Sequence, residues 1–519
     1  MNHSFFLDQL SYKKNYPTTN MSTTTITTTM TPHLPNDCLR DVFEYLTHHP
    51  KSLHSCLLVN RLWCENAVPI LWRDPFRYNR TFYYDSNYWK SITHIILLCL
   101  PQESKDIFES NDIKLPKLSS KSPLFDYVGC CQYISCQDIY EIISEIIGYE
   151  QSFADISWYY NLNLVENEIW KMFMNRCQSL KYIEIPNVSL PYIPGSSICL
   201  PQLTELECST YKSPKLFVDL AQIVKDLVRL VINLCDEDNN GLISLITSQN
   251  RLQEVKLISS EGNECPGIGQ ALITQATTLI SIEFEENLCL QPEHLSMLTN
   301  LKRLSIDLEE DNSGLNLLES VILPKLEILE VGRLDAPSPS SSSSSVSPYS
   351  LEFYMNIIKP TTQIERIEIE TWPHPPKYQI LSYNQIILKY CSKLEYVSFW
   401  YFNEVFKDLE EFLTCSIQLK GINIEAVTDE NDNNNEEYWL DSCDVLGLIV
   451  NKASTNLEEI VLSGAWNLSL EDLQDFLEGW RKRKSLYLRL SIDFELTNEH
   501  IEMLNDYEAI GLLKGWSRW

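Results

Sequence analysis

A short apolar motif recurs along most of this chain and restricts the folds open to it. The motif is Leu-x-x-Leu/Ile/Val-x-Leu/Ile/Phe, and its first apolar residue falls at Leu180, Leu203, Leu227, Leu252, Leu279, Leu301, Leu326, Ile364, Leu394, Leu419, Leu457 and Leu486. Neighbouring copies are 22 to 30 residues apart, except for two steps of 38. A period in this range predicts an array of units, each of which buries its apolar face only against its neighbours.

Each repeat is expected to hold one strand and one helix. The alternating apolar residues of the motif predict the strand, and the segments between motifs carry helical spacing, for example at Leu220, Ile223, Val224 and Leu227. The pattern resembles leucine-rich repeats, although it lacks a regular Asn after the strand. The resemblance implies an α/β horseshoe with a parallel concave sheet and outer helices.

Both long steps contain a polar insertion. One is DAPSPSSSSSSVSPYS at residues 335–350, and the other is TDENDNNNEEYW at residues 428–439. Insertions of this composition predict surface loops. Ser338 and Ser347 each precede a proline and are candidates for phosphorylation, with an inert flexible loop as the alternative.

Three short amphipathic segments precede the repeats. Their apolar residues are Leu39, Val42, Phe43 and Leu46, then Leu53, Cys56, Leu57 and Val59, then Trp63, Ala67, Ile70 and Leu71. The spacing places each set on one helical face. Three helices in so few residues bury little apolar surface, so we expect the module to depend on a partner or on the next domain.

The order of residues in this module resembles the F-box motif. The resemblance rests on Leu34-Pro35, Leu39, Val42-Phe43, Leu46, Leu53, Cys56, Val59-Asn60-Arg61, Trp63 and Leu71-Trp72. Asn60 stands where the family more often has Cys, and Cys38 where it has Ile or Val. The resemblance implies a non-catalytic adaptor that docks on the Skp adaptor of a cullin-RING ubiquitin ligase and holds a protein substrate for ubiquitination. The implied docking surface and its support are Leu34, Pro35, Leu39, Val42, Phe43, Leu46, Leu53, Val59 and Trp63.

The sequence therefore predicts four regions. They are a disordered tail (1–31), the F-box (32–75), a connector with an N-terminal cap (76–150) and the leucine-rich repeats (151–519). Within the connector, an aromatic run from Phe76 to Trp89 should pack the module against the array, Ile92 to Leu100 should form a buried strand, and residues 139–147 a helix. Residues 497–516, with Ile501, Leu504, Leu512 and Leu513, are predicted to form a terminal helical cap.

Composition excludes several classes of function. The net charge of -30 argues against nucleic acid and anionic membranes as partners. The N-terminus lacks a secretory signal, and the sixteen cysteines show no CxxC pair, as expected of reduced thiols in a cytoplasmic or nuclear protein. We found no catalytic, cofactor-binding or metal-binding motif, so an enzyme is not expected.

Charged residues occupy the alternate positions of the strands that should face the concave side. Acids outnumber bases there, and Glu205, Glu254, Lys256, Glu283 and Arg303 are the candidate substrate-binding residues. Such a surface would favour a protein partner with a basic or mixed patch, with a solvated face that binds nothing as the alternative. For the whole chain, the alternative to a ligase adaptor is a protein-interaction scaffold that works without a ligase.

Overall fold

A computed structural model of the chain describes residues 34–77, 86–118, 122–148, 156–308, 320–334, 351–361, 363–371, 374–427, 439–491 and 496–518. The predictions for the tail (1–31), for Ser338 and Ser347, for the insertion at 335–350 and for residues 428–438 lie outside these ranges. The chain divides into two compact units. Unit 1 is Met1–Leu230 with Ser248–Arg251, and unit 2 is Val231–Thr247 with Leu252–Trp519.

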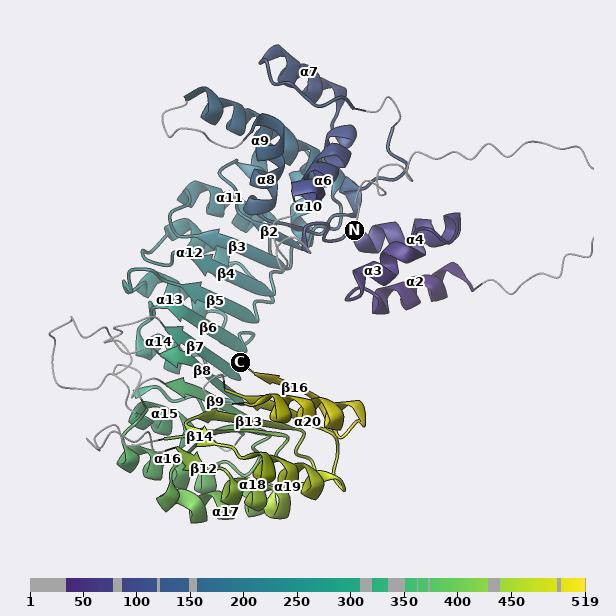
Figure 1. Cartoon of the computed structure of the whole chain (residues 1–519). Helices are drawn as coiled ribbons and strands as arrows, with labels where there is room; N and C mark the ends of the chain where they lie inside the picture. Colours follow the sequence, from purple (N-terminus) through teal and green to yellow (C-terminus); the bar gives the residue numbers. More distant parts are fainter. Residues whose placement is uncertain are drawn as a thin grey trace, which may run out of the picture. The chain divides into compact units, whose positions relative to one another are not determined.

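Unit 1 begins with the three predicted helices, α2 (Asn36–Tyr45), α3 (Pro50–Cys56) and α4 (Arg61–Leu71) (Figure 1). They share a small core made of Leu39, Phe43, Leu53, Cys56, Ala67 and Ile70. Pro50 lies in the first turn of α3, where its missing N–H costs nothing. Asn60 caps α4, because its side-chain oxygen accepts a hydrogen bond from the Trp63 N–H at 2.9 Å.

Helices follow this module in unit 1. They are α6 (Ser86–Cys99), α7 (Gln102–Ser110), η1 (Val128–Cys130), α8 (Cys136–Ile147) and α9 (Ile156–Arg176). The helix predicted at 139–147 lies within α8, which begins with a reciprocal capping box between Ser135 and Asp138.

The strand predicted at Ile92 to Leu100 is wrong, because these residues belong to α6 and the residue after it. Ile95, Ile96 and Leu97 are all buried, so the apolar run has no polar face that would reveal its period. Periodicity alone cannot separate a buried strand from a buried helix, and the fourteen residues of α6 are longer than most strands.

The repeat pattern starts within unit 1. Strands β1 (Tyr133–Ile134), β2 (Tyr182–Glu184) and β3 (Glu205–Ser209) pair in parallel, and β4 (Arg229–Asn233) contains the boundary between the units. The intervening segments are η2 (Leu190–Tyr192), α10 (Ser196–Cys199), η3 (Leu200–Gln202) and α11 (Pro214–Ile223). The sequence did not predict β1, which has two residues and no motif.

Unit 2 continues the alternation of strand and helix. Its main strands are β5 (Glu254–Ile258), β6 (Ser281–Glu286), β7 (Arg303–Leu308), β8 (Ile328–Leu334), β9 (Arg366–Thr371), β10 (Tyr396–Tyr401), β11 (Gly421–Ala426), β13 (Glu459–Gly464), β15 (Leu486–Leu490) and β16 (Leu513–Arg518). Each pairs in parallel with the next in this order. A separate parallel pair joins β12 (Leu440–Asp441) to β14 (Trp466–Asn467).

Helices connect the strands of unit 2. They are α12 (Asn240–Thr247), α13 (Pro266–Ile273), α14 (Pro292–Ser296), α15 (Leu351–Ile358), α16 (Lys377–Tyr390), η5 (Asn403–Val405), α17 (Phe406–Cys415), α18 (Cys443–Lys452), α19 (Leu470–Trp480) and α20 (Asn498–Ala509). The apolar motif residues of the strands are buried, as Ile282 and Phe284 show in β6, where the alternate residues are partly exposed. In β10 all six residues are buried, and in β11 all but Glu425. The predicted fold class is confirmed: a three-helix module and then a long parallel sheet with flanking helices.

The predicted terminal cap is only partly helical. Helix α20 ends at Ala509, and residues 513–518 form strand β16, which pairs with β15. Gly511 has a φ of 78°, a conformation that glycine adopts without steric cost and that turns the chain out of the helix. Leu512 and Leu513 are therefore not on the face of the terminal helix, and Leu513 is buried as a strand residue.

A buried polar network in unit 2 links the loops that follow β4, β5 and β6. The Asp236 carboxylate accepts hydrogen bonds from the Ser259 hydroxyl at 2.8 Å, the Ser260 hydroxyl at 2.8 Å and the Glu261 N–H at 3.0 Å. Asn287 donates to the Ser259 carbonyl at 2.7 Å. Asp236 is almost fully buried, and these polar groups would be costly to leave unpaired, so the network fixes the loop that follows β5.

Replacing Asp236 with Ala is expected to lower the free energy of unfolding of unit 2 by about 2–3 kcal/mol, because several donors lose a charged acceptor. Asp236→Asn should cost less, since it keeps one acceptor oxygen. The hydrogen bonds outweigh burial and lower the pKa of Asp236, so its contribution is complete at pH 7 and is lost only as the pH falls below the ordinary range of aspartate. Chemical denaturation at pH 7 measures the difference, and equal stability of wild type and Asp236→Ala would contradict the assignment.

Candidate functional site

Helix α2 presents an apolar row to solvent although its other face is buried. Cys38, Val42 and Tyr45 follow one another at i, i+4 and i+7, and all three are exposed. Val42 is 49% and Tyr45 85% exposed, and Leu34, just before the helix, is 55% exposed. In the turn between α3 and α4, Leu58 and Val59 are also exposed. A module this small gains nothing in stability from such exposed side chains, which marks them as candidates for contact with a partner.

The structure divides the predicted docking residues into two groups. Leu39, Phe43 and Leu53 are buried, and Leu46 and Trp63 pack partly against them. The remaining four are exposed: Leu34, Pro35, Val42 and Val59. The residues of the first group can only support the contact surface from inside the module, whereas those of the second can touch another protein.

Sequence reasoning missed three further exposed residues of this surface, Cys38, Tyr45 and Leu58. The signal for two of them was present, because Cys38 and Tyr45 share the helical spacing of Val42.

An aromatic contact holds the inner face of the module. The rings of Phe43 in α2 and Trp63 in α4 meet edge to face with centroids 5.2 Å apart. The Asn60 cap fixes the first turn of α4 and so the position of Trp63. The residue that departs from the common F-box pattern therefore has a structural role here.

Arg73 ties the module to the rest of unit 1. Its guanidinium binds both oxygens of Glu44 in α2, at 2.9 and 2.6 Å, and this pairing holds the pKa of Glu44 below its ordinary value. The Arg73 carbonyl accepts from the Gln132 N–H at 2.7 Å. The Gln132 carbonyl in turn accepts from the N–H groups of Lys181 at 2.8 Å and Tyr182 at 3.0 Å, beside β2.

Aromatic rings reinforce this connection. Phe76 stacks on Trp89 of α6 with centroids 5.6 Å apart, and Trp72 packs on Tyr127 at 4.7 Å. These contacts join the module to α6 and to Tyr127 of the connector, and the packing of the aromatic run against the repeats stays a prediction. Its other members, Tyr78, Phe82, Tyr83 and Tyr84, lie outside the described residues.

Residues 31–78 match the F-box-like family model. The matched range contains the three helices, the exposed row of α2 and Arg73, so the chain carries an F-box-like module at its N-terminal side. Within this module, Glu44 and Arg73 make the ion pair that closes α2 against the segment after α4.

The solved structures that match this chain include a distant neighbour. The crystal structure of the leucine-rich repeat-containing protein LegL7 from Legionella pneumophila matches 60% of this chain and 93% of that chain, with 10% identity and a TM-score of 0.29. No curated protein matches the sequence. The neighbour is too distant to support an argument about binding.

The predicted substrate-binding residues lie on several strands. Glu205 belongs to β3 of unit 1, whereas Glu254 and Lys256 (β5), Glu283 (β6) and Arg303 (β7) belong to unit 2. The structure brings Lys256 and Glu283 together, with the ammonium and carboxylate 2.9 Å apart.

The cations of this surface are already neutralised. Lys256 also binds Glu285, and these hydrogen bonds outweigh its partial burial and raise the pKa of Lys256. Arg303 binds Glu330 of β8 at 2.6 Å. Glu254 is exposed, and no cation of the described residues pairs with it. The strands β5 to β8 therefore keep a surplus of negative charge.

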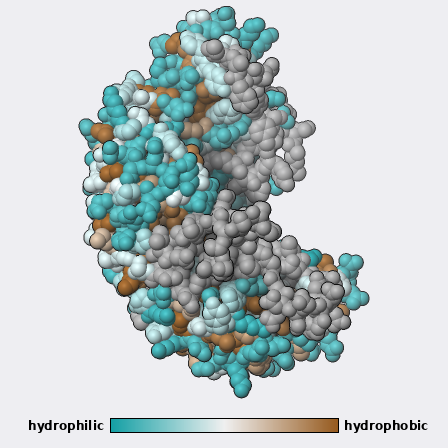
Figure 2. All heavy atoms as spheres, turned by 90° about the vertical axis from the view of Figure 1, so that its left-hand side faces the viewer, coloured by the Kyte–Doolittle hydropathy of each residue, from teal (hydrophilic) through white to brown (hydrophobic). Residues whose placement is uncertain are grey.

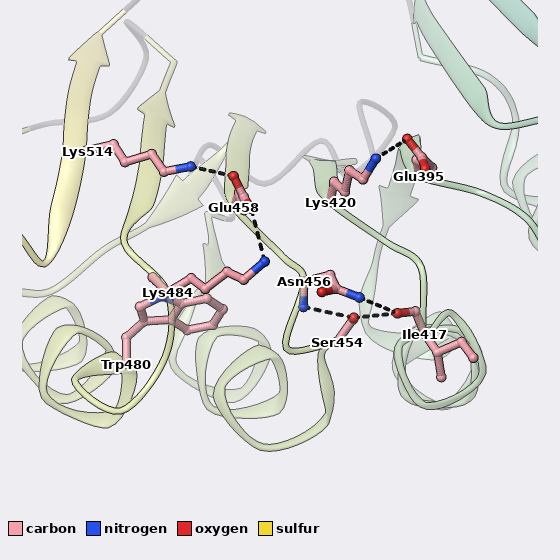
Figure 3. A network of polar contacts seen from close by, with 9 residues as sticks. All are labelled: Glu395, Ile417, Lys420, Ser454, Asn456, Glu458, Trp480, Lys484 and Lys514. Carbon is pink, nitrogen blue, oxygen red and sulfur yellow. Dashed lines mark hydrogen bonds and ion pairs between the residues drawn. The ribbon is translucent and has the colours of Figure 1, made fainter.

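A hollow of about 510 Å³ lies elsewhere on unit 2, and the sequence did not predict it. Residues of successive strands line it, from Ile328 in β8 to Lys514 in β16, and we call it the C-terminal trough. At its rim Lys420 binds Glu395 at 2.6 Å (Figure 3). Glu395 and Lys420 each directly follow the first residue of a motif, one position before the alternate strand residues that the sequence predicts on the concave side.

The side of unit 2 that carries α12 to α14 is mostly hydrophilic with scattered hydrophobic patches (Figure 2). In the part of the chain that the structure describes, no cluster of three His, Cys, Asp or Glu residues is arranged to hold a metal ion. No described helix has the length and apolar character needed to cross a membrane. An F-box-like module combined with repeats of this type is typical of non-catalytic interaction proteins.

Phe43→Ala is expected to destabilise the module by about 3–5 kcal/mol, because it removes a fully buried ring, and Val42→Ala, at an exposed position, should change stability by less than about 0.5 kcal/mol. Hydrogen exchange of α2 to α4 in the full chain measures both. Faster exchange confined to Phe43→Ala is the expected outcome, and equal protection in the two variants would contradict the division into core and surface.

Proposed function

We propose that this protein is a substrate-recognition adaptor of a cullin-RING ubiquitin ligase. Its F-box-like module would dock on a Skp-type adaptor and through it on a cullin, and its repeats would hold a protein substrate for ubiquitination. The exposed row of α2 carries the proposal, because Val42 and Tyr45 lie at the surface of a module whose family is known for this contact. The supporting core beneath them keeps the row in place.

The role requires no catalytic group. Holding a substrate beside a ubiquitin-charged enzyme converts a bimolecular encounter into a nearly intramolecular one. Rigid attachment of the module helps, since a substrate lysine must stay near the charged enzyme. The contacts of Arg73 with Glu44 and Gln132 provide such an attachment within unit 1.

The substrate is proposed to be a protein with a basic or mixed charge pattern. The surplus of carboxylates on β5 to β8 favours such a partner, and the overall charge of -30 disfavours nucleic acid and anionic membranes. A cytoplasmic or nuclear location fits this role and belongs to the proposal.

The alternative is a protein-interaction scaffold that works without a ligase, with the module acting as a cap for the repeats. A cap would be expected to present a polar outer face. Leu34, Val42 and Tyr45 present apolar groups instead.

The contact with the Skp-type adaptor can be tested by pull-down of the full chain. Val42→Glu is expected to weaken binding at least about tenfold, because a charge would be buried in an apolar contact. The pair Leu34→Ala with Pro35→Ala should weaken it as well. Ile198→Glu is the matched control, since Ile198 is 65% exposed on α10, outside the module.

Absence of binding by the wild type would overturn the adaptor role and leave the ligase-independent scaffold. If Val42→Glu and the Leu34→Ala/Pro35→Ala pair both bind as tightly as the wild type, these exposed residues do not form the contact with the adaptor. Hydrogen exchange of α2 to α4 in each variant shows whether a loss of binding reflects unfolding.

A further inference from the structure

The C-terminal trough has a floor that runs across the strands of unit 2. Strand register places Arg366 (β9) beside Tyr396 (β10), and Tyr396 beside Gly421 (β11). The row continues through Glu459 (β13) to Tyr487 (β15). The lining therefore follows one line of residues at right angles to the strands.

Gly421 keeps this floor open. It has no side chain, and a Cβ atom at this position would collide with the Tyr396 ring. Because residue 421 is glycine, the Tyr396 ring can lie against β11. The Arg366 guanidinium packs on this ring, 4.3 Å from its centroid. Further along, Arg489 binds Glu459 at 2.9 Å. The floor thus consists of aromatic rings and of charged side chains that already have partners in the protein. Such a floor suits the backbone and apolar side chains of a bound peptide.

The two ends of the trough differ in charge. At the β9 end, Glu365 is exposed, and among the described side chains no cation lies within ion-pair distance of it. At the β16 end, Glu458 is shared by Lys484, at 3.3 Å, and Lys514 (Figure 3). Lys302 acts on Glu365 electrostatically, but its direct ion pair is with Glu327. One end therefore has a carboxylate without a direct ion pair, and the other has an excess ammonium group.

A bulge creates the positive end. Leu486 of β15 pairs with Leu513, but the next residue, Tyr487, pairs with Gly515. Lys514 is the extra residue between them, and its side chain reaches Glu458 over the trough.

The distance between these ends sets the length of the occupant. The ammonium groups of Lys484 and Lys514 lie at Glu458, which directly precedes β13, so three strand spacings separate them from Glu365. These spacings, from β9 through β10 and β11 to β13, amount to about 14 Å at 4.8 Å each. An extended chain covers this distance in about four residues. A hollow of about 510 Å³ spread over that length is narrow, as a single extended peptide requires.

We propose that the C-terminal trough binds an extended segment of the substrate that carries a basic side chain and, about four residues away, an acidic side chain. The basic group would pair with Glu365, and the acidic group with Lys514 and Lys484. This inference rests on the proposed function, in that the segment belongs to the protein that the repeats hold.

A library of random octapeptides displayed on phage, selected on the immobilised full chain, tests the inference. The expected result is enrichment of peptides with Lys or Arg and, about four residues away, Asp or Glu. Glu365→Gln should abolish the preference for the basic residue alone, and Glu365→Lys should convert it into a preference for an acidic one. A selected peptide should bind Glu365→Gln about three- to fivefold more weakly, as expected for one exposed ion pair.

Glu411→Lys is the matched control, because Glu411 is an exposed carboxylate of α17 outside the trough. It should leave the selected sequences unchanged. Absence of any enriched pattern, or a basic preference that survives Glu365→Lys, would overturn the inference. Selection of peptides with like charges at both positions would also overturn it.

Binding of the Skp-type adaptor is measured on the same protein preparations. This measurement distinguishes a failure of the proposed ligase role from a failure of the proposed peptide site. A chain that binds the adaptor but selects no peptide would overturn the trough alone. A chain that selects the expected peptides but does not bind the adaptor would support the trough and overturn the ligase role.

Discussion

Burial of apolar residues between neighbouring repeats is the constraint on which the rest of this structure depends. A strand such as β6 buries Ile282 and Phe284, yet it is only six residues long and could not shield them by itself. Its stability comes from the strands and helices on either side, so the repeats are stable only as a series. Charged residues can then occupy alternate positions of strands such as β5 to β7, because the buried residues supply the cohesion.

The same reasoning explains why the F-box-like module is joined so closely to its neighbours. Its core contains few fully buried residues, among them Leu39, Phe43 and Leu53. A core of this size provides little stability, and additional contacts raise it. Arg73 supplies two of these contacts, one through its side chain to Glu44 and one through its carbonyl to Gln132. The module can consequently leave Val42 and Tyr45 exposed for a partner.

Much of the fold could be predicted from the sequence, because buried leucines leave a periodic trace. Every motif from Leu180 to Leu486 coincides with a strand, and the three helices of the module lie where the spacing placed them. The errors fall where periodicity carries no information. The apolar run of α6 is mostly buried, β1 has two residues, and Gly511 ends a helix that the apolar pattern would have continued.

The candidate sites were less predictable. Val42 and Phe43 are adjacent apolar residues of one motif, and only the packing of α2 shows that the first is exposed and the second buried. The C-terminal trough depends on strand register, which brings Glu365, Glu458 and Lys514 to one edge from distant parts of the chain. Sequence spacing did not reveal that register, because the repeat lengths vary.

The bulge at Lys514 has a further consequence for solubility. In the described sheet of unit 2, β16 pairs with β15 and with no later strand, so its outer edge carries unpaired backbone groups. Such an edge is a template for pairing with another chain and for aggregation. An irregular strand with Lys514 and Arg518 is a poor template, because the bulge breaks the ladder and the cations repel an identical edge. The residue that completes one end of the C-terminal trough thus also protects the open end of the sheet from association.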